Sequence, residues 1–172
     1  MRIAIIGYSG SGKSTLASRL GEKYGVEVLY LDKVHWLPGW TERDRREELS
    51  ITQEFLDKNS SWVIDGNYSK SFYERRMEEA DSIIFMNFNR FSCLKRILKR
   101  FKNNKGKTRD SMTEGCNEKI DAEFLKWILW DGRTKKHKNR FKDTVNRYKN
   151  KVTVIRNGRE LTKYYNEHGL KY

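Results

Sequence analysis

The sequence has few of the residues that build disulfide frameworks, metal clusters or rigid turns. Its 172 residues include two cysteines, three histidines and one proline. Cys93 and Cys116 have neither metal-binding nor redox spacing, and the histidines show no zinc pattern, so we expect reduced thiols and no zinc site. No apolar run approaches the roughly 18 residues that span a membrane, and the segment before Gly7 is too short for a signal peptide. We therefore expect a cytoplasmic protein.

Positive charge, by contrast, is in excess. The chain carries 36 lysines and arginines against 23 acidic residues, a net charge of +13, and most of the excess follows residue 90. Such a field attracts nucleotides, phosphorylated metabolites, nucleic acid or anionic surfaces without choosing among them. The alternative interpretation is a set of solvated helix faces. The length and the 37% hydrophobic content indicate one globular domain, residues 1–172.

Short apolar runs alternate with amphipathic segments along the chain. We expect strands at residues 2–7, 26–32, 61–66, 81–88 and 151–158. We expect helices at 13–25, 41–59, 71–80, 90–102, 118–130, 134–150 and 159–169. Thr41 is the predicted N-cap of the second helix, and residues 33–40 are expected to be loop. The alternation predicts an α/β fold with a five-stranded parallel sheet and helices on both faces. Residues 100–150 are long for a connection and predict a lid.

The strongest motif is GYSGSGKST at residues 7–15, which completes G-x-x-x-x-G-K-[ST] between a predicted strand and a predicted helix. Glycines let the backbone wrap closely around anionic oxygens, and the helix N-terminus adds a favourable dipole. Lys13 is expected to reach the β- and γ-phosphates of ATP, and Ser14 to hold Mg²⁺. A chance match in a glycine-rich turn is the weaker interpretation. The predicted ATP-binding residues of this motif are Gly7, Ser9, Gly10, Ser11, Gly12, Lys13, Ser14 and Thr15.

Two carboxylates end predicted strands. Asp32 ends LYLD and Asp65 ends WVID. The carboxyl ends of parallel strands face the ligand crevice, so both side chains are expected at the phosphate site. We expect Asp65 to join Ser14 at the magnesium and Asp32 to orient or deprotonate a phosphate acceptor. Each could instead be an ordinary turn former at a strand end.

An aromatic segment follows Asp32. Trp36, Trp40 and His35 are expected to wall an acceptor site, with packing against the next helix as the alternative. His35 is a second candidate for the base. Arg75 and Arg76, which follow DGNY, are expected to reach the same side. The predicted acceptor-side residues are Asp32, His35, Trp36, Trp40, Asn67, Arg75 and Arg76.

Arginines are the expected source of positive charge over the transferring group, because their planar fork binds oxyanions at two points. Arg96 and Arg100 are spaced i, i+4 and share one helix face. Arg133 opens the later basic segment, and Arg140 lies further along it. We predict a catalytic set formed by Lys13, Asp32, Arg96, Arg100 and Arg133.

Several stretches together resemble the bacterial DNA topology modulation family, also described as FlaR-related, whose members are small adenylate-kinase-like P-loop proteins. The stretches are GYSGSGKST, LDKVHWLPGW, WVIDGNY and EGCNEKIDAEFLKWILW, and they span most of the chain. The second and fourth are the more specific. In the fourth, the matching residues are Glu114, Gly115, Cys116, Glu118, Asp121, Phe124 and Trp127.

The resemblance implies a nucleoside-monophosphate-kinase-like fold with strand order 2-3-1-4-5, and binding of ATP with Mg²⁺. We also expect an acceptor-side insertion at about residues 33–75 and a lid region at about residues 103–140. The resemblance also implies adenine against the turn at Arg156 and Asn157, which is otherwise an ordinary turn before the last helix. One departure is Ser111, where the family pattern has Asp before Met112. Asp110 could take over that role.

The sequence supports two functions of different classes. The first is a phosphotransferase that moves the γ-phosphate of ATP to a small hydroxyl or phosphate acceptor, either nucleoside- or nucleotide-like or another metabolite. DGNY replaces the D-G-F-P-R string of adenylate kinases, which argues against adenylate kinase activity itself. The second is a nucleotide-regulated DNA- or RNA-binding protein, although no helix-turn-helix, zinc finger or RRM signature is present. A plain ATPase switch ranks third.

Overall fold

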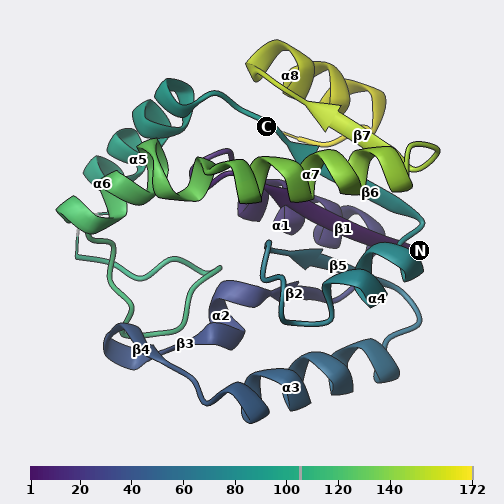
Figure 1. Cartoon of the computed structure of the whole chain (residues 1–172), viewed down its shortest axis with the longest axis horizontal. Helices are drawn as coiled ribbons and strands as arrows, with labels where there is room; N and C mark the ends of the chain where they lie inside the picture. Colours follow the sequence, from purple (N-terminus) through teal and green to yellow (C-terminus); the bar gives the residue numbers. More distant parts are fainter. Residues whose placement is uncertain (105, 172) are drawn as a thin grey trace.

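A parallel sheet forms the centre of the chain in the computed structural model, which describes residues 1–104 and 106–171 (Figure 1). Lys105, in the predicted lid region, and Tyr172 lie outside the described residues. The sheet contains, in spatial order, β2 (Val28–Tyr30), β5 (Trp62–Asp65), β1 (Arg2–Gly7), β6 (Ser82–Met86) and β7 (Val152–Ile155). All four strand pairings are parallel. Numbered along the chain, the five strands follow the order 2-3-1-4-5, so the predicted fold class is confirmed.

Helices cover both faces of this sheet. They are α1 (Lys13–Tyr24), α2 (Leu31–His35), α3 (Arg45–Lys58), α4 (Tyr73–Glu79), α5 (Arg90–Asn104), α6 (Ala122–Leu129), α7 (Lys135–Arg147) and α8 (Gly158–Glu167). The 3-10 turns are η1 (Pro38–Trp40) and η2 (Asp131–Arg133). In Figure 1, α7 crosses in front of β1 and α1 lies behind it. Lys23 of α1 donates to the His168 carbonyl just after α8, and Tyr73 of α4 bonds Thr144 of α7, so α8 flanks α1 and α4 flanks α7.

The core is built on β1, the central strand. Ile3, Ala4, Ile5 and Ile6 are all at most 3% exposed, because the strand is covered on both faces and paired on both edges. Burial of each isoleucine side chain contributes roughly 1.5–3 kcal/mol. This pattern places the end of β1, where the phosphate motif begins, at the rigid middle of the sheet.

The segment after β2 differs from the predicted strand and loop. β2 ends at Tyr30, and Asp32 lies in the first turn of α2 rather than at the end of the strand. Residues 36–42 form a small antiparallel pair, β3 (Trp36–Leu37) with β4 (Thr41–Glu42). The prediction of Thr41 as N-cap was wrong. Asp44 caps α3, because its carboxylate accepts hydrogen bonds from the backbone N–H groups of residues 46 and 47.

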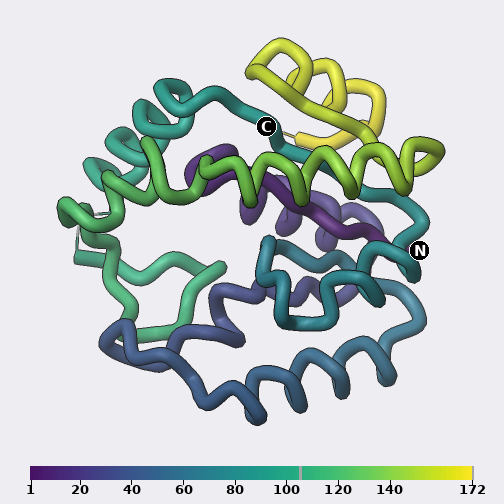
Figure 2. Tube along the Cα trace, in the orientation of Figure 1, coloured from purple at the N-terminus to yellow at the C-terminus, as the bar shows by residue number. Residues whose placement is uncertain are grey.

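The connection between α5 and α6 crosses the molecule. Figure 2 shows it leaving α5 and reaching the turn between β3 and β4 before it returns to α6. The α6 helix begins at Ala122, later than predicted, because the Asp121 side chain accepts from the backbone N–H of Phe124 and caps the helix. Within the described parts of the chain, no helix has the length and apolar character needed to cross a membrane.

Candidate phosphate-binding site

The phosphate loop (residues 7–15) joins β1 to α1 at the centre of the sheet. Gly7, Gly10 and Gly12 have φ of 145°, 77° and 99°, which favour glycine, and Gly12 caps α1. A Cβ atom on Gly7 would lie 2.5 Å from the Met86 carbonyl oxygen. The motif glycines are therefore required both by backbone conformation and by the close approach of β6.

The polar side chains of this loop have distinct environments. Ser11 is fully buried, and its hydroxyl has no hydrogen-bond partner among the described residues. The Ser9 hydroxyl accepts from Trp127 Nε1 of α6 at 3.3 Å. Lys13 Nζ donates to the Tyr8 carbonyl at 3.2 Å, Ser14 is half-buried and Thr15 is exposed. The loop thus contacts α6 through Ser9. The side chain of Lys13 folds back onto the backbone of the same loop.

Asn67 holds the phosphate loop in place. Its Oδ1 accepts from the Gly7 N–H at 2.9 Å, and its Nδ2 donates to the Gly7 carbonyl at 2.7 Å. Both hydrogen-bonding groups of the side chain are therefore used by one residue of the loop. The predicted acceptor residue Asn67 is placed by the structure as a clamp on the phosphate loop.

Asp65, at the end of β5, lies beside Lys13 and Ser14. It is 5% exposed, and its Oδ1 has no hydrogen-bond partner within the described residues. Burial raises the pKa of the Asp65 carboxyl to about 6; Lys13 and Ser14 act against this increase, and Asp32 adds to it. A buried carboxylate oxygen next to a hydroxyl is a donor set that suits a hard divalent cation such as Mg²⁺. Among the described residues, no three His, Cys, Asp or Glu side chains group as metal ligands, so such an ion would need phosphate or water oxygens as well.

Asp32 lies at the same edge of the sheet. Its Oδ1 accepts a hydrogen bond of 2.8 Å from the Tyr68 hydroxyl. Burial strongly raises the pKa of Tyr68, and the negative charge of Asp32 raises it further, so the hydroxyl remains a donor. Tyr68 comes from the DGNY segment and was not among the predicted site residues.

The aromatic residues after Asp32 form one continuous group with Tyr68. The His35 ring lies 4.7 Å from that of Trp36 and 4.9 Å from that of Tyr68, and Trp36 lies 5.6 Å from Trp40. His35 Nδ1 is 3.1 Å from Oε2 of Glu48, a buried carboxylate of α3. The aromatic residues predicted to line an acceptor site thus lie together, and they pack against α3 through His35. Their role toward an acceptor stays a prediction.

Two arginines contact the phosphate loop, and two more pair with a buried glutamate beyond it. Arg96 donates to the Ser11 carbonyl at 2.7 Å, and its guanidinium lies 4.2 Å from the Phe88 ring centroid. Arg133 lies 3.7 Å from the centroid of the Tyr8 ring and donates to backbone carbonyls. Arg100 and Arg109 both pair with Glu118. Arg96, Arg100 and Arg133 were predicted as catalytic residues. Arg109 was not, because it lies in a segment with no periodic signal, and Glu118 was named only as a residue of the family motif.

Arg76 and Arg75 lie away from the phosphate loop. Arg76 is fully buried and donates to the carbonyls of Ser71, Gly66 and Tyr68, so it supports the segment that carries Asn67. Burial lowers the pKa of Arg76 to about 10, which leaves it charged at neutral pH. Arg75 pairs instead with Asp57 and Glu79. The prediction that these two side chains reach an acceptor does not agree with these contacts.

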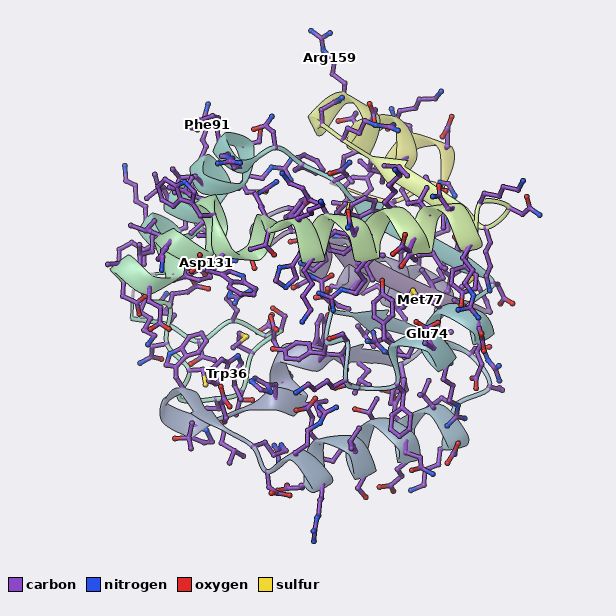
Figure 3. The ribbon with its side chains drawn as sticks, in the orientation of Figure 1. Trp36, Glu74, Met77, Phe91, Asp131 and Arg159 are labelled. Carbon is purple, nitrogen blue, oxygen red and sulfur yellow. The ribbon has the colours of Figure 1, made fainter. Side chains whose placement is uncertain are left out.

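The turn expected to meet adenine lies before α8. Asn157 caps α8 through its side chain, and the Arg156 N–H donates to Glu160. Arg159 points away from the body of the molecule (Figure 3). An open cavity is lined by Asn157, Gly158, Arg159 and Thr162. A Cβ on Gly158 would lie 3.9 Å from Arg96 Nη2, so Arg96 reaches from the phosphate loop to this turn.

The remaining predicted positions lie around this site. Arg140 of α7 lies over the ring of Tyr73, 5.9 Å from its centroid, rather than over the phosphate loop. The Ser111 hydroxyl accepts from Arg109 Nη1 at 3.3 Å, whereas the charge of Asp110 acts on Tyr30. Ser111 therefore supports the arginine of the unpredicted pair.

Comparison with known proteins gives a family and a fold. The deoxyadenosine kinase of M. mycoides, solved with dCMP and dCDP, has a TM-score of 0.55 at 16% identity and covers 98% of both chains. The same kinase with dATP has a TM-score of 0.52 at 16% identity, covering 98% of this chain and 100% of that one. The Thermus thermophilus protein TT1252 has a TM-score of 0.55 at 14% identity, covering 98% and 95%. No curated protein matches the sequence.

These structural similarities, together with the strand order, show a P-loop kinase-like fold. The sequence profile of the AAA domain family matches residues 3–126, which is more than half of the chain and includes the phosphate loop, Asp32 and Asp65. The chain therefore belongs to the AAA domain family.

Proposed function

We propose that this protein is a phosphotransferase that moves the γ-phosphate of ATP to a small nucleoside- or nucleotide-like acceptor. One observation supports the proposal above the others: Asp65 ends β5, and Asp32, just after the neighbouring strand β2, accepts a 2.8 Å hydrogen bond from Tyr68. A second carboxylate held by Tyr68 and facing an aromatic wall suits an acceptor hydroxyl.

Ser14 and Asp65 would hold Mg²⁺, which would neutralise charge on the phosphates. The N–H groups of the phosphate loop and Lys13 bind the triphosphate. Asp32 accepts the proton of the acceptor hydroxyl while the oxygen of that hydroxyl forms a bond to the γ-phosphorus. The bond from that phosphorus to the bridging oxygen breaks, and ADP leaves. Tyr68 keeps the Asp32 carboxylate oriented during this transfer.

The aromatic wall supports a flat acceptor. The rings of His35, Trp36, Trp40 and Tyr68 contact one another in sequence and present a π-surface for a base. The deoxyadenosine kinase of M. mycoides shares the fold, which places a nucleoside or nucleotide first among the acceptors to be tested.

An acceptor screen tests the proposal. The protein with Mg-ATP is mixed with pools of nucleosides, nucleotides, sugars and polyols, and ADP release is followed. We expect one nucleoside or nucleotide pool to stimulate release. Lys13→Ala and Asp32→Asn should each lower the stimulated rate by about 100-fold or more. Tight ATP binding without stimulation by any pool would contradict the proposal and favour a nucleotide-regulated binding protein.

A further inference from the structure

The segment after α5 folds into a compact lid turn (residues 107–118). The backbone N–H of Glu118 donates to the Lys107 carbonyl at 3.1 Å, and the Thr108 hydroxyl donates to Asn117 Oδ1 at 2.9 Å. These contacts join the two ends of the turn, so that Arg109 and Glu118 face each other.

The lid turn is docked on the acceptor loop (residues 33–40). The Thr113 hydroxyl lies 3.1 Å from the Lys33 carbonyl and 2.5 Å from the Trp36 carbonyl. The Gly39 N–H donates to the Gly115 carbonyl at 3.3 Å, and Trp40 Nε1 donates to the Asn117 carbonyl at 3.2 Å.

Glu118 links the docked lid turn to helix α5. Its side chain is 4% exposed and pairs with two guanidinium groups, Arg100 Nε at 3.1 Å and Arg109 Nε. Arg100 comes from α5 and Arg109 from the lid turn, so one buried carboxylate joins the two segments. A carboxylate between two arginines leaves a net positive pair. Apart from Arg109 Nη1, which donates to Ser111, its other N–H groups can donate to an oxyanion.

The arginine pair lies near the phosphate loop and Asp32. Arg100 is one turn beyond Arg96 on α5, and Arg96 donates to the Ser11 carbonyl of the phosphate loop. The Thr113 hydroxyl of the lid turn contacts the carbonyl of Lys33, the residue after Asp32. The charge of Asp32 also acts on Arg100, against the lowering of its pKa by burial. These contacts bring the pair within reach of a phosphate held by the loop.

We propose that Glu118 is a positioning residue that holds Arg100 and Arg109 on the γ-phosphate of ATP, and that docking of the lid turn on the acceptor loop sets its position. The inference rests on the proposed function. It adds that the acceptor side and the arginine pair act as one unit, so acceptor-loop contacts influence recognition of the nucleotide. The phosphate loop holds the inner phosphates. The arginine pair should therefore raise the affinity only for a nucleotide that has a γ-phosphate.

The test compares binding of two nucleotides rather than activity. Affinities for Mg-ADP and for a non-hydrolysable Mg-ATP analogue are measured by calorimetry, and their ratio gives the preference for the γ-phosphate. We expect Glu118→Gln to lower this preference by about tenfold, as loss of charge-assisted hydrogen bonds predicts, with ADP affinity nearly unchanged. Glu118→Asp should restore part of it. The matched control is Glu123→Gln, which removes the same charge from an exposed position on α6 and should have no effect.

Two further variants keep the test decisive. Arg109→Gln should lower the γ-phosphate preference even if Glu118→Gln folds poorly. Thr113→Ala should lower it in the native background and have little added effect beside Glu118→Gln, because both changes act through one contact. An unchanged preference in a folded Glu118→Gln protein, or simple additivity with Thr113→Ala, would overturn the inference. The binding ratio is measured without an acceptor. A failed acceptor screen would therefore count against the proposed function, and an unchanged γ-phosphate preference against the role of Glu118.

Discussion

Tyr68 and Asp32 are 36 positions apart in sequence, yet the tyrosine hydroxyl donates a 2.8 Å hydrogen bond to the aspartate. The bond joins the segment that follows β5 to the first turn of α2, at the edge of the sheet that carries the phosphate loop. It fixes one oxygen of Asp32. The other oxygen is then presented in a constant direction, which a base needs if it is to meet an acceptor hydroxyl.

We expect Tyr68→Phe to lower the turnover number for transfer by about tenfold, the size expected for one hydrogen bond to a charged group. The γ-phosphate preference should stay unchanged, because Tyr68 contacts neither arginine of the Glu118 pair. Steady-state kinetics with the acceptor found in the screen measure the effect. Tyr24→Phe, at an exposed position of α1, is the matched control. Equal rates in the two variants would remove Tyr68 from the proposed mechanism.

The neighbouring residues Arg75 and Arg76 should differ sharply in their effect on stability. Arg76→Met leaves three carbonyls without their donor, two of them in buried hydrogen bonds, so the free energy of unfolding should fall by about 3 kcal/mol or more. Arg75→Met breaks only surface ion pairs and should cost within about 1 kcal/mol. Urea unfolding of both variants measures the difference. Similar losses in the two would show that the buried contacts of Arg76 contribute little.

The same pair shows what the sequence could and could not predict. Residues 75 and 76 are adjacent in α4, and successive helix positions point about 100° apart, so one can be buried while the other is exposed. Nothing local decides which one faces the core. The carbonyls of the DGNY segment determine the outcome, because they accept hydrogen bonds from Arg76 and so hold it in the core.

Regular patterns, in contrast, were sufficient for the sheet and the phosphate loop. Continuous apolar runs predicted buried parallel strands, and the strand-end rule brought Asp65 to the phosphate loop. Asp32 reaches the same edge from a short helix, which the pattern did not predict. Arg109 lies in a segment without period and Glu118 at the start of a predicted helix, and their pairing depends on how the lid turn folds back. The resemblance to the topology modulation family stays a prediction.

Asp65 should make the stability of the metal-free protein depend on pH. Its folded pKa is about 6, against an ordinary value of 3.8, so the folded state binds the proton more tightly. Stability therefore falls as pH rises from about 4 to above 6 and then levels off. Asp65→Asn removes this penalty. With EDTA present, it should raise the free energy of unfolding at pH 8 by roughly 2–3 kcal/mol, and the gain should nearly vanish near pH 4.

Urea unfolding of both proteins across this pH range checks the prediction. If the free energies of unfolding of the two proteins differ by the same amount at every pH, burial does not disfavour the ionised carboxylate of Asp65. The variant should also lose stimulated ADP release, since Asp65 is a proposed Mg²⁺ ligand. A gain in stability together with a loss of activity would indicate that the carboxylate is kept for binding rather than for folding.

The last prediction separates the proposed transfer from binding of nucleic acid. Lys135, Lys136 and Lys138 are exposed at the start of α7. If α7 binds DNA, changing all three to Glu should weaken binding and reduce the slope of log affinity against log salt by about 2–3, because three phosphate contacts are lost. Transfer should stay nearly unchanged, since these lysines lie outside the proposed site. Reversal of exposed Lys58 and Lys163, on α3 and α8, is the control. Loss of transfer in the α7 variant would place the basic helix in the active site, and an unchanged salt slope would remove α7 as a nucleic-acid surface.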